Sequence, residues 1–218
     1  MHGPLPLLIV TDQTLLREGL LSLMELTGRF RAVGTSTADA ADALRARPVK
    51  VAVVDASALP NHGRDLIRVI QGQSPDARIL ILDDMVRPLR LAAVVKARVS
   101  GYWTKQASFE ELRGAIQRIV AGGSSFCPEA QRYLISNNGR VRFRPTADAK
   151  PIARLSPRET QVLTLLAAGL SVQQCADRLA LSPSTVDNHK TRMMKKLDIH
   201  KTADLVRLAV SEGIVDVD

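Results

Sequence analysis

The sequence predicts an α/β domain followed by an all-α domain, and three observations lead to that fold class. Short apolar runs alternate with longer amphipathic segments through residue 123. Two of the runs, VAVV (51–54) and ILIL (79–82), are apolar on both faces, as expected of central parallel strands covered by helices. From Ser156 onward, the patterned segments have only helical periodicity.

The N-terminal part is expected to form a doubly wound (βα)5 parallel sheet over residues 1–123. The predicted strands are 7–10, 30–36, 49–55, 78–83 and 100–104. Helical patterns lie between and after them at 14–26, 37–46, 62–72, 88–97 and 108–121. Strands separated by helices require βαβ units, and right-handed crossovers leave this topology as the economical one. Ligands of such sheets bind beyond the carboxyl ends of the strands.

Residues 124–153 are expected to form a linker. A short helix is possible within 127–136, with Pro128 in its first turn, and 137–153 is polar and basic. The C-terminal domain is then 154–218. SPRE (156–159) is a capping box, and further helices are expected from Ser171, Ser182 and Thr202. Two short helices joined by the tight ALSP turn form a helix-turn-helix.

Composition points to a cytoplasmic protein with a polyanionic partner. No apolar run is long enough to span a bilayer, no export signal is present, and the two distant cysteines are expected to pack as thiols. The formal charge is +8. Residues 154–218, however, carry 9 basic against 8 acidic groups. Nucleic-acid binding by that part must therefore depend on a local basic cluster within 184–201.

The motifs of the two halves together resemble one family. LSPRETQVLTLLAAGLSVQQCADRLALSPSTVDNHKTRMMKKLDI is similar to the DNA-binding domain of LuxR-type (GerE-type) regulators. TDQTLLREGL, Asp55 and GYWTK, each after a predicted strand, resemble a response-regulator receiver. The chain thus resembles the FixJ/NarL group of response regulators over nearly its whole length. The resemblance implies a flavodoxin-like receiver, a four-helix DNA-binding domain, a role in transcription and a sensor histidine kinase as a partner.

The resemblance places helix 184–196 in the major groove of double-stranded DNA. Helical spacing puts Val186, Met193 and Leu197 on a core stripe and leaves the opposite side polar. The candidate DNA contacts are Ser184, Thr185, Asn188, Thr191, Arg192, Lys195 and Lys196. Arg192 could read a guanine edge and Asn188 an adenine edge. Asp187 departs from the family pattern, in which a lysine is usual, so the target sequence cannot be transferred.

The last helix is expected to join two copies of the chain. TADLVRLAVSEG carries more apolar side chains than one small domain easily covers. In the family this helix pairs two DNA-binding domains, which implies a homodimer on a two-fold site through Leu205, Val206 and Ala209. The alternative is that the helix only completes its own domain core.

The receiver pocket departs from the pattern that the resemblance implies. A working receiver has two adjacent acids after strand one and a phosphoacceptor Asp after strand three. It has a hydroxyl residue after strand four and a Lys after strand five. Asp55, Tyr102 and Lys105 match, and Asp12 is the second acid. Thr11 replaces the first acid and Asp83 replaces the hydroxyl residue.

These changes predict a receiver that ordinary phosphorylation of Asp55 does not control. Magnesium requires several oxygen ligands, and Asp12 with Asp55 are the candidates for holding it. Asp83 could supply a further oxygen, or it could pair with Lys105 and lock one conformation. Two other functions stay open: an orthodox phosphorylation switch, and a protein-interaction adaptor that has lost DNA binding. An enzyme is not expected, because the sequence has no nucleophile–base pair, phosphate-binding glycine loop or metal cluster.

Overall fold

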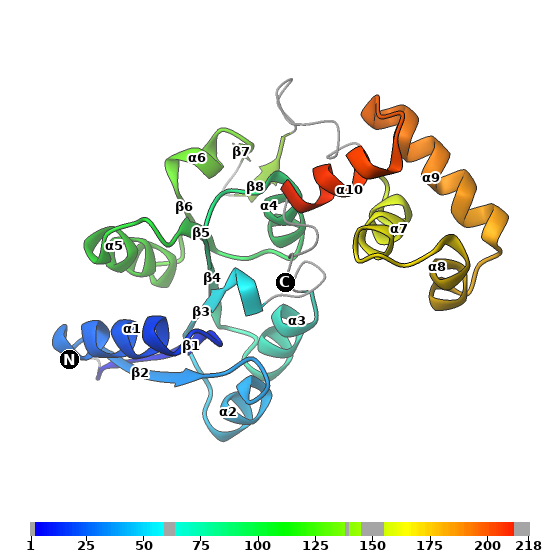
Figure 1. Cartoon of the computed structure of the whole chain (residues 1–218). Coiled ribbons are helices and arrows are strands. Elements are labelled where there is room, and N and C mark those ends of the chain that lie inside the picture. Colours follow the sequence, from blue (N-terminus) through cyan, green and yellow to red (C-terminus); the bar gives the residue numbers. More distant parts are fainter. Residues whose placement is uncertain (1–2, 59–63, 138–139, 145–154, 212–218) are drawn as a thin grey trace. The chain divides into compact units, whose positions relative to one another are not determined.

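Figure 1 shows the computed structural model of the chain, which describes residues 3–58, 64–137, 140–144 and 155–211. The chain divides into two compact units. The first takes in Met1–Val86 and Arg90–Arg144, and the second takes in Pro145–Asp218 together with Arg87–Leu89. The predicted fold class, a parallel-sheet domain followed by a helical domain, is confirmed.

The first unit is built on a six-stranded parallel sheet in the order β2-β1-β3-β4-β5-β6. The strands are β1 (Leu5–Val10), β2 (Phe30–Thr35), β3 (Val51–Asp55), β4 (Arg78–Asp83), β5 (Gly101–Thr104) and β6 (Ser125–Phe126). The sixth strand was not predicted. It has only two residues and follows two glycines, so it leaves no periodic signal.

Helices cover both faces of this sheet. They are α1 (Thr14–Leu26), α2 (Ala40–Ala46), α3 (Arg64–Gln73), α4 (Pro88–Lys96) and α5 (Phe109–Val120), with a short η1 turn (Ala56–Ala58) after β3. α1 and α5 lie on one face, and α2, α3 and α4 lie on the other (Figure 1). Both faces of β3 are therefore covered, and all five of its residues are buried. The predicted (βα)5 order is confirmed by this arrangement.

The segment predicted as a linker is partly folded. α6 spans only Pro128–Gln131, so a helix over the whole of 127–136 would be too long. β7 (Leu134–Asn137) and β8 (Arg140–Phe143) then form an antiparallel hairpin. Leu134, Val141 and Phe143 pack against the core of the first unit. This unit consequently runs to Arg144, beyond the predicted boundary at residue 123.

The second unit contains α7 (Pro157–Ala167), α8 (Val172–Leu179), α9 (Pro183–Leu197) and α10 (Thr202–Ser211). Capping boxes start α7 and α8 at Ser156 and Ser171, because each serine pairs reciprocally with a side chain three residues later. The predicted core stripe of α9 is fully packed: Val186, Met193 and Leu197 are buried. The helix-turn-helix formed by α8 and α9 is therefore present.

The described residues include both cysteines and the helices that bear on membrane crossing. Cys127 and Cys175 are both free and buried, and burial raises the pKa of the Cys127 thiol to about 11. Such a thiol is protonated and unreactive at neutral pH, which fits the packing role predicted for it. Among the described helices, none is both long and apolar enough to cross a membrane.

Candidate receiver pocket and DNA-binding face

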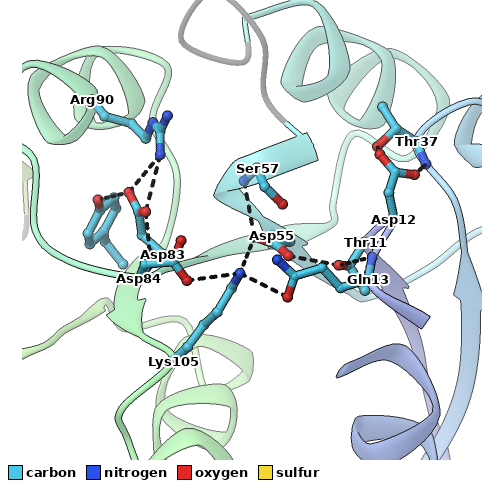
Figure 2. A network of polar contacts seen from close by, with 11 residues as sticks. Thr11, Asp12, Gln13, Thr37, Asp55, Ser57, Asp83, Asp84, Arg90 and Lys105 are labelled. Atoms are coloured by element: carbon cyan, nitrogen blue, oxygen red, sulfur yellow. Dashed lines mark hydrogen bonds and ion pairs between the residues drawn. The ribbon is translucent and has the colours of Figure 1, made fainter. Parts of the chain in front are cut away.

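The pocket of the first unit lies where strands β1, β3, β4 and β5 end. Parallel strands bring their carboxyl ends to one edge of the sheet, so residues far apart in sequence gather there. Thr11, Asp55, Asp83 and Lys105 are held in this way, and Figure 2 shows them in one network of polar contacts. Of the predicted pocket residues, Thr11 and Lys105 each contact Asp55 directly.

Asp55 has both carboxylate oxygens occupied. It is only 3% exposed. Its Oδ2 accepts a hydrogen bond from Thr11 Oγ1 at 2.7 Å. Its Oδ1 accepts one from the Ser57 backbone N–H at 3.0 Å and lies 3.0 Å from Lys105 Nζ. Thr11 thus does more than replace the acid expected at this position. Its hydroxyl donates a hydrogen bond that occupies one carboxylate oxygen of Asp55.

Lys105 connects three residues at the mouth of the pocket. Besides Asp55, its Nζ lies 3.1 Å from Asp84 Oδ1 and 3.3 Å from Gln13 Oε1. Burial lowers the pKa of Lys105, but the contacts with Asp55 and Asp84 outweigh burial and raise the pKa overall. The amine is therefore charged at neutral pH.

The alternative in which Asp83 pairs with Lys105 is not what the structure contains. The side chain of Lys105 contacts the neighbouring Asp84, and only its backbone N–H reaches the Asp83 carbonyl, at 2.7 Å. Adjacent residues at a strand end point to opposite sides, so the two acids face different partners. Sequence inspection cannot tell which of two consecutive aspartates faces the lysine.

Asp83 belongs to a separate buried cluster with Arg90 and Tyr102. Its side chain is 1% exposed, and Arg90 Nη1 lies 3.1 Å from Oδ1 and 3.0 Å from Oδ2. Arg90 is itself 6% exposed. The Tyr102 hydroxyl donates to Asp83 Oδ2, and the Asp84 N–H donates to Oδ1. Figure 2 shows Arg90 and Asp83 facing each other. A buried guanidinium thus balances a buried carboxylate.

Arg90 is the pocket residue that sequence reasoning missed. It lies in α4, in the segment PLRLAAVVK, whose pattern indicates an ordinary amphipathic helix with a surface arginine. The only available signal was indirect: an acid at a buried strand end requires a partner, and Arg90 is one of two arginines that follow within seven residues.

Asp12 faces away from Asp55. Its carboxylate accepts hydrogen bonds from the Thr37 backbone N–H at 2.8 Å and from Thr37 Oγ1 at 2.6 Å. Figure 2 shows this pair on the far side of the Thr11 backbone. The structure therefore does not bring together the two carboxylates predicted to hold magnesium.

The donor set around Asp55 does not fit a magnesium ion. Magnesium demands an octahedral set of oxygen ligands and is usually held by carboxylates. Here a hydroxyl donates toward Asp55, and a charged ammonium lies on its other oxygen. Within the described ranges, no group of three or more His, Cys, Asp or Glu residues is arranged to hold a metal.

The outer face of α9 in the second unit is polar and exposed. Ser184, Asn188, Thr191, Arg192, Lys195 and Lys196 are exposed, and Thr185 is half-buried. The hydroxyls of Ser184 and Thr185 lie 3.0 and 2.7 Å from that of Ser182, which caps the helix. The unexpected acid Asp187 is paired with Lys190 at 3.2 Å, so its charge is locally offset.

Lys196 is exposed on this face of α9, and its side chain also contacts another helix of the second unit. Its Nζ donates to Glu159 Oε2 at 2.7 Å, which ties the end of α9 to the start of α7. Glu159 is 3% exposed and also accepts from the Ser156 N–H. Burial raises the pKa of Glu159, but the bonds from Lys196 and Ser156 outweigh burial and lower it overall. Local sequence patterns do not predict this pair, because its members lie in different helices.

Two of the three residues predicted for dimerisation are buried within a single chain. Leu205 and Ala209 are both 0% exposed and belong to the core of the second unit. They are therefore not available to a partner chain. This burial agrees with the alternative in which the helix completes the core of its own domain. Val206 is half-buried, and it shares a helical stripe with exposed Ala203 and half-buried Val210.

Comparisons with known sequences match both units. Residues 153–209 match the family of bacterial regulatory proteins described as the luxR family. The chain is 30% identical over 217 residues to the response regulator UvrY of Escherichia coli O6:H1, which covers 97% of the chain and 96% of UvrY. It is 29% identical over 214 residues to the response regulator GacA of Pseudomonas protegens, covering 96% of the chain and 97% of GacA.

Solved structures of the response regulator RcsB are also similar. RcsB from Salmonella enterica serovar Typhimurium, bound to promoter P1flhDC with the phosphomimetic BeF3−, matches with a TM-score of 0.60 at 25% identity. That match covers 94% of the chain and 97% of RcsB. A second Salmonella typhimurium RcsB structure reaches a TM-score of 0.65 at 23% identity, over 97% of the chain and 99% of RcsB, which shows the shared fold.

Proposed function

Because the chain belongs to the NarL/FixJ group of response regulators, which join a receiver to a LuxR-type DNA-binding domain, we propose that its receiver is not switched by ordinary phosphorylation of Asp55. The protein is a DNA-binding transcription regulator of the two-component type and not an enzyme. The proposal concerns how the receiver of this regulator is controlled.

The observation that supports the proposal most directly is the place of Asp83. Asp55 is paired with Leu82 in the register of β3 and β4, so Asp83 is the next residue on the adjacent strand. Adjacent strands lie about 4.8 Å apart. A phosphoryl group on Asp55 would thus meet, where the resemblance implies a hydroxyl donor, a carboxylate whose oxygens already accept hydrogen bonds from Arg90 and Tyr102.

The contacts of Tyr102 support the same conclusion. By resemblance, the aromatic residue on β5 moves together with the hydroxyl residue that binds the phosphoryl group. Here the Tyr102 ring is 0% exposed and its hydroxyl already donates to Asp83, which Arg90 holds in turn. The inward position of Tyr102 is therefore stabilised by the protein's own groups and does not require a phosphate.

Phosphate uptake by the full-length chain tests the proposal. The protein is incubated with acetyl phosphate and magnesium, and its intact mass is measured. We expect little phosphate on the wild-type chain and clear uptake by the triple variant Thr11→Asp/Asp83→Thr/Arg90→Gln, which restores both missing groups and removes the buried guanidinium that bound Asp83. Asp55→Asn in the restored background is the blank. Stoichiometric phosphate on wild-type Asp55 would overturn the proposal.

One observation favours the orthodox switch as a second candidate. Lys105 Nζ lies 3.0 Å from Asp55, at the position where a lysine would offset the charge of a phosphoryl group. The same assay separates the two candidates. Beryllofluoride provides a second measurement: a magnesium-dependent change in Trp103 fluorescence on adding it would favour the orthodox switch, whereas we expect none.

For DNA binding, we propose that α9 enters the major groove with Asn188, Arg192 and Lys195 toward the DNA. All three are exposed on one face, and no carboxylate among the described residues pairs with Arg192 or Lys195. Arg192 is suited to a guanine edge and Asn188 to an adenine edge. Thr191, Ser184 and Thr185 are suited to phosphates.

We also propose that the chain binds DNA as a homodimer, through the stripe of Ala203, Val206 and Val210 on α10. Leu205 and Ala209 fill the domain core, so this neighbouring stripe is the apolar surface that α10 leaves accessible. One solved structure contains two RcsB dimers on two parallel DNAs. A two-fold dimer would present two copies of α9 to a pseudo-palindromic site.

A further inference from the structure

The β7–β8 hairpin presents two different faces. In the register, Leu134 is opposite Phe143, and Ile135 is opposite Arg142. Leu134 and Phe143 pack against the core of the first unit. Successive side chains of a strand point to opposite faces, so Ile135 and Arg142 lie on the outer face. Ile135 is 43% exposed and Arg142 is exposed.

Unbalanced positive charge surrounds this outer face. Residues 131–144 contain four arginines, Arg132, Arg140, Arg142 and Arg144, and no acidic residue. Arg132, Arg142 and Arg144 are exposed, and none of these three side chains forms an ion pair with any residue that the structure describes. A set of unpaired arginines on one surface is the usual footprint of a polyanion partner.

The hairpin holds these arginines on a fixed backbone. The rings of Tyr133 and Phe143 stack with centroids 6.2 Å apart and planes 7° from parallel. The Arg144 N–H donates to the Tyr133 carbonyl at 2.7 Å. A pre-ordered backbone lowers the entropy lost when the side chains bind a ligand. The segment is thus better suited to binding than a flexible basic tail of equal charge.

The length of chain between the hairpin and the second unit limits their separation. From Arg144 to Leu155 there are eleven peptide steps, which at about 3.5 Å each reach at most about 39 Å. This limit holds whatever path the intervening residues take. One turn of DNA is about 34–36 Å long. A chain of this length therefore allows the hairpin and α9 to contact the same duplex.

The second unit also needs positive charge from elsewhere. It carries 9 basic against 8 acidic groups, and three of its basic side chains are paired internally, Lys190 with Asp187, Lys196 with Glu159 and Arg207 with Asp204. Contacts with the phosphate backbone supply much of the affinity of DNA-binding proteins. A nearly neutral domain offers few of them.

We propose that the outer face of the β7–β8 hairpin, with Arg142 and Arg144 at its centre, is a second DNA-binding surface that contacts the phosphate backbone of the duplex to which α9 binds. Guanidinium groups bind phosphate oxygens in a bidentate manner. These contacts carry no sequence information and add affinity and orientation. The proposal does not depend on how the receiver is controlled.

The salt dependence of binding measures such contacts. Each phosphate contact contributes about 0.9 to the slope of log K against log salt concentration. The full-length Arg142→Gln/Arg144→Gln variant is compared with the wild type on a random-sequence duplex of about three turns. We expect weaker binding and a slope smaller by about 1.8 for two lost contacts.

A matched control distinguishes the loss of direct phosphate contacts from the loss of net positive charge. Arg29 and Arg31 are also exposed, are also two residues apart at a strand of the first unit, and remove the same charge when both become Gln. We expect the slope of this control to equal that of the wild type. Arg142→Lys/Arg144→Lys keeps the charge and should keep most of the slope.

Three outcomes would overturn the proposal. The first is an unchanged slope for the hairpin variant, which would show that the arginines do not contact DNA and serve a protein or another anionic partner. The second is an equal loss in the control pair, which would mean a long-range charge effect. The third is a lowered unfolding temperature of the hairpin variant that accounts for its weaker binding, whereas we expect exposed substitutions to leave that temperature unchanged.

Discussion

Arg90 Nη1 lies within 3.1 Å of both carboxylate oxygens of Asp83, and both side chains are at least nine-tenths buried. The pair joins α4 to the end of β4, the strand next to the one that ends in Asp55. Removing both charges of a buried pair often costs little, whereas removing one leaves an uncompensated charge in the interior. The two residues are therefore expected to depend on each other.

Arg90→Gln should destabilise the first unit by about 3 kcal/mol, because it removes the guanidinium that binds both oxygens of the buried Asp83 carboxylate. Urea unfolding followed by Trp103 fluorescence measures this, since Trp103 is the only tryptophan and lies in β5. The double variant Asp83→Asn/Arg90→Gln should recover much of the loss. Additive losses from the two single changes would contradict the coupling.

Thr11→Asp should create magnesium binding that the wild type lacks. The change replaces the hydroxyl that donates to Asp55 with a second carboxylate beside it, and two carboxylates attract a hard divalent cation. Magnesium should then raise the unfolding temperature of the variant, because it binds only the folded state. Thr11→Asn, of similar size and no charge, is the control. Equal stabilisation of the wild type by magnesium would contradict the expectation.

The sequence was sufficient to place the pocket residues but not to assign their partners. Parallel strands end at one edge, so the strand pattern together with the resemblance to a receiver predicts that Asp55, Asp83 and Lys105 lie in one pocket. Which carboxylate faces Lys105 depends on the direction of two adjacent side chains, and the answer was Asp84. Arg90 reaches Asp83 from a helix whose packing against β4 is a tertiary property, beyond the reach of local pattern.

The same limit applies to elements with weak or ambiguous patterns. The sequence predicts a linker where the hairpin lies, because the strands of the hairpin are four residues each and rich in polar side chains. Its inner apolar residues pack against a core that exists only in the folded domain, so the local sequence does not reveal their role. In α10 the apolar positions were identified correctly, but the pattern does not say which of them face the domain core and which face a partner.

Glu159→Gln should destabilise the second unit by about 1–2 kcal/mol, since it weakens the cap of α7 and the bond to Lys196. The folded-state pKa of Glu159 is below its ordinary value of 4.5. Its contribution is therefore present above that value and is lost as the pH falls through the lower, folded-state pKa.

Urea unfolding followed by circular dichroism, at pH 7 and in steps below 4.5, checks this dependence. The stability difference between wild type and Glu159→Gln should shrink toward acid pH. Glu111→Gln, which changes a capping-box glutamate of α5 in the other unit, is the matched control. A difference that stays constant with pH would show that the charge of Glu159 does not matter.

Arg192→Ala and Lys196→Ala should affect DNA binding in different ways. Arg192 is exposed without a carboxylate partner among the described residues, so its loss should relax base preference at one position, by about 1–3 kcal/mol. Lys196 is bonded to Glu159, so its loss should mainly lower the stability of the second unit. Binding to duplexes that differ at single base pairs measures the first effect, and thermal unfolding measures the second. Equal base preference in wild type and Arg192→Ala would contradict the readout role.

Val206→Glu should convert a dimer of the full-length chain to a monomer and leave the fold intact. Val206 is only half-buried, so the new carboxylate can reach water in the monomer, but a two-fold interface would bring it close to its own copy. Gln161→Glu, which adds the same charge at an exposed position of α7, should leave the dimer unchanged. Sedimentation measures the oligomeric state, and circular dichroism verifies the fold. A Val206→Glu chain that still sediments as a dimer would show that the interface lies elsewhere than on this stripe of α10.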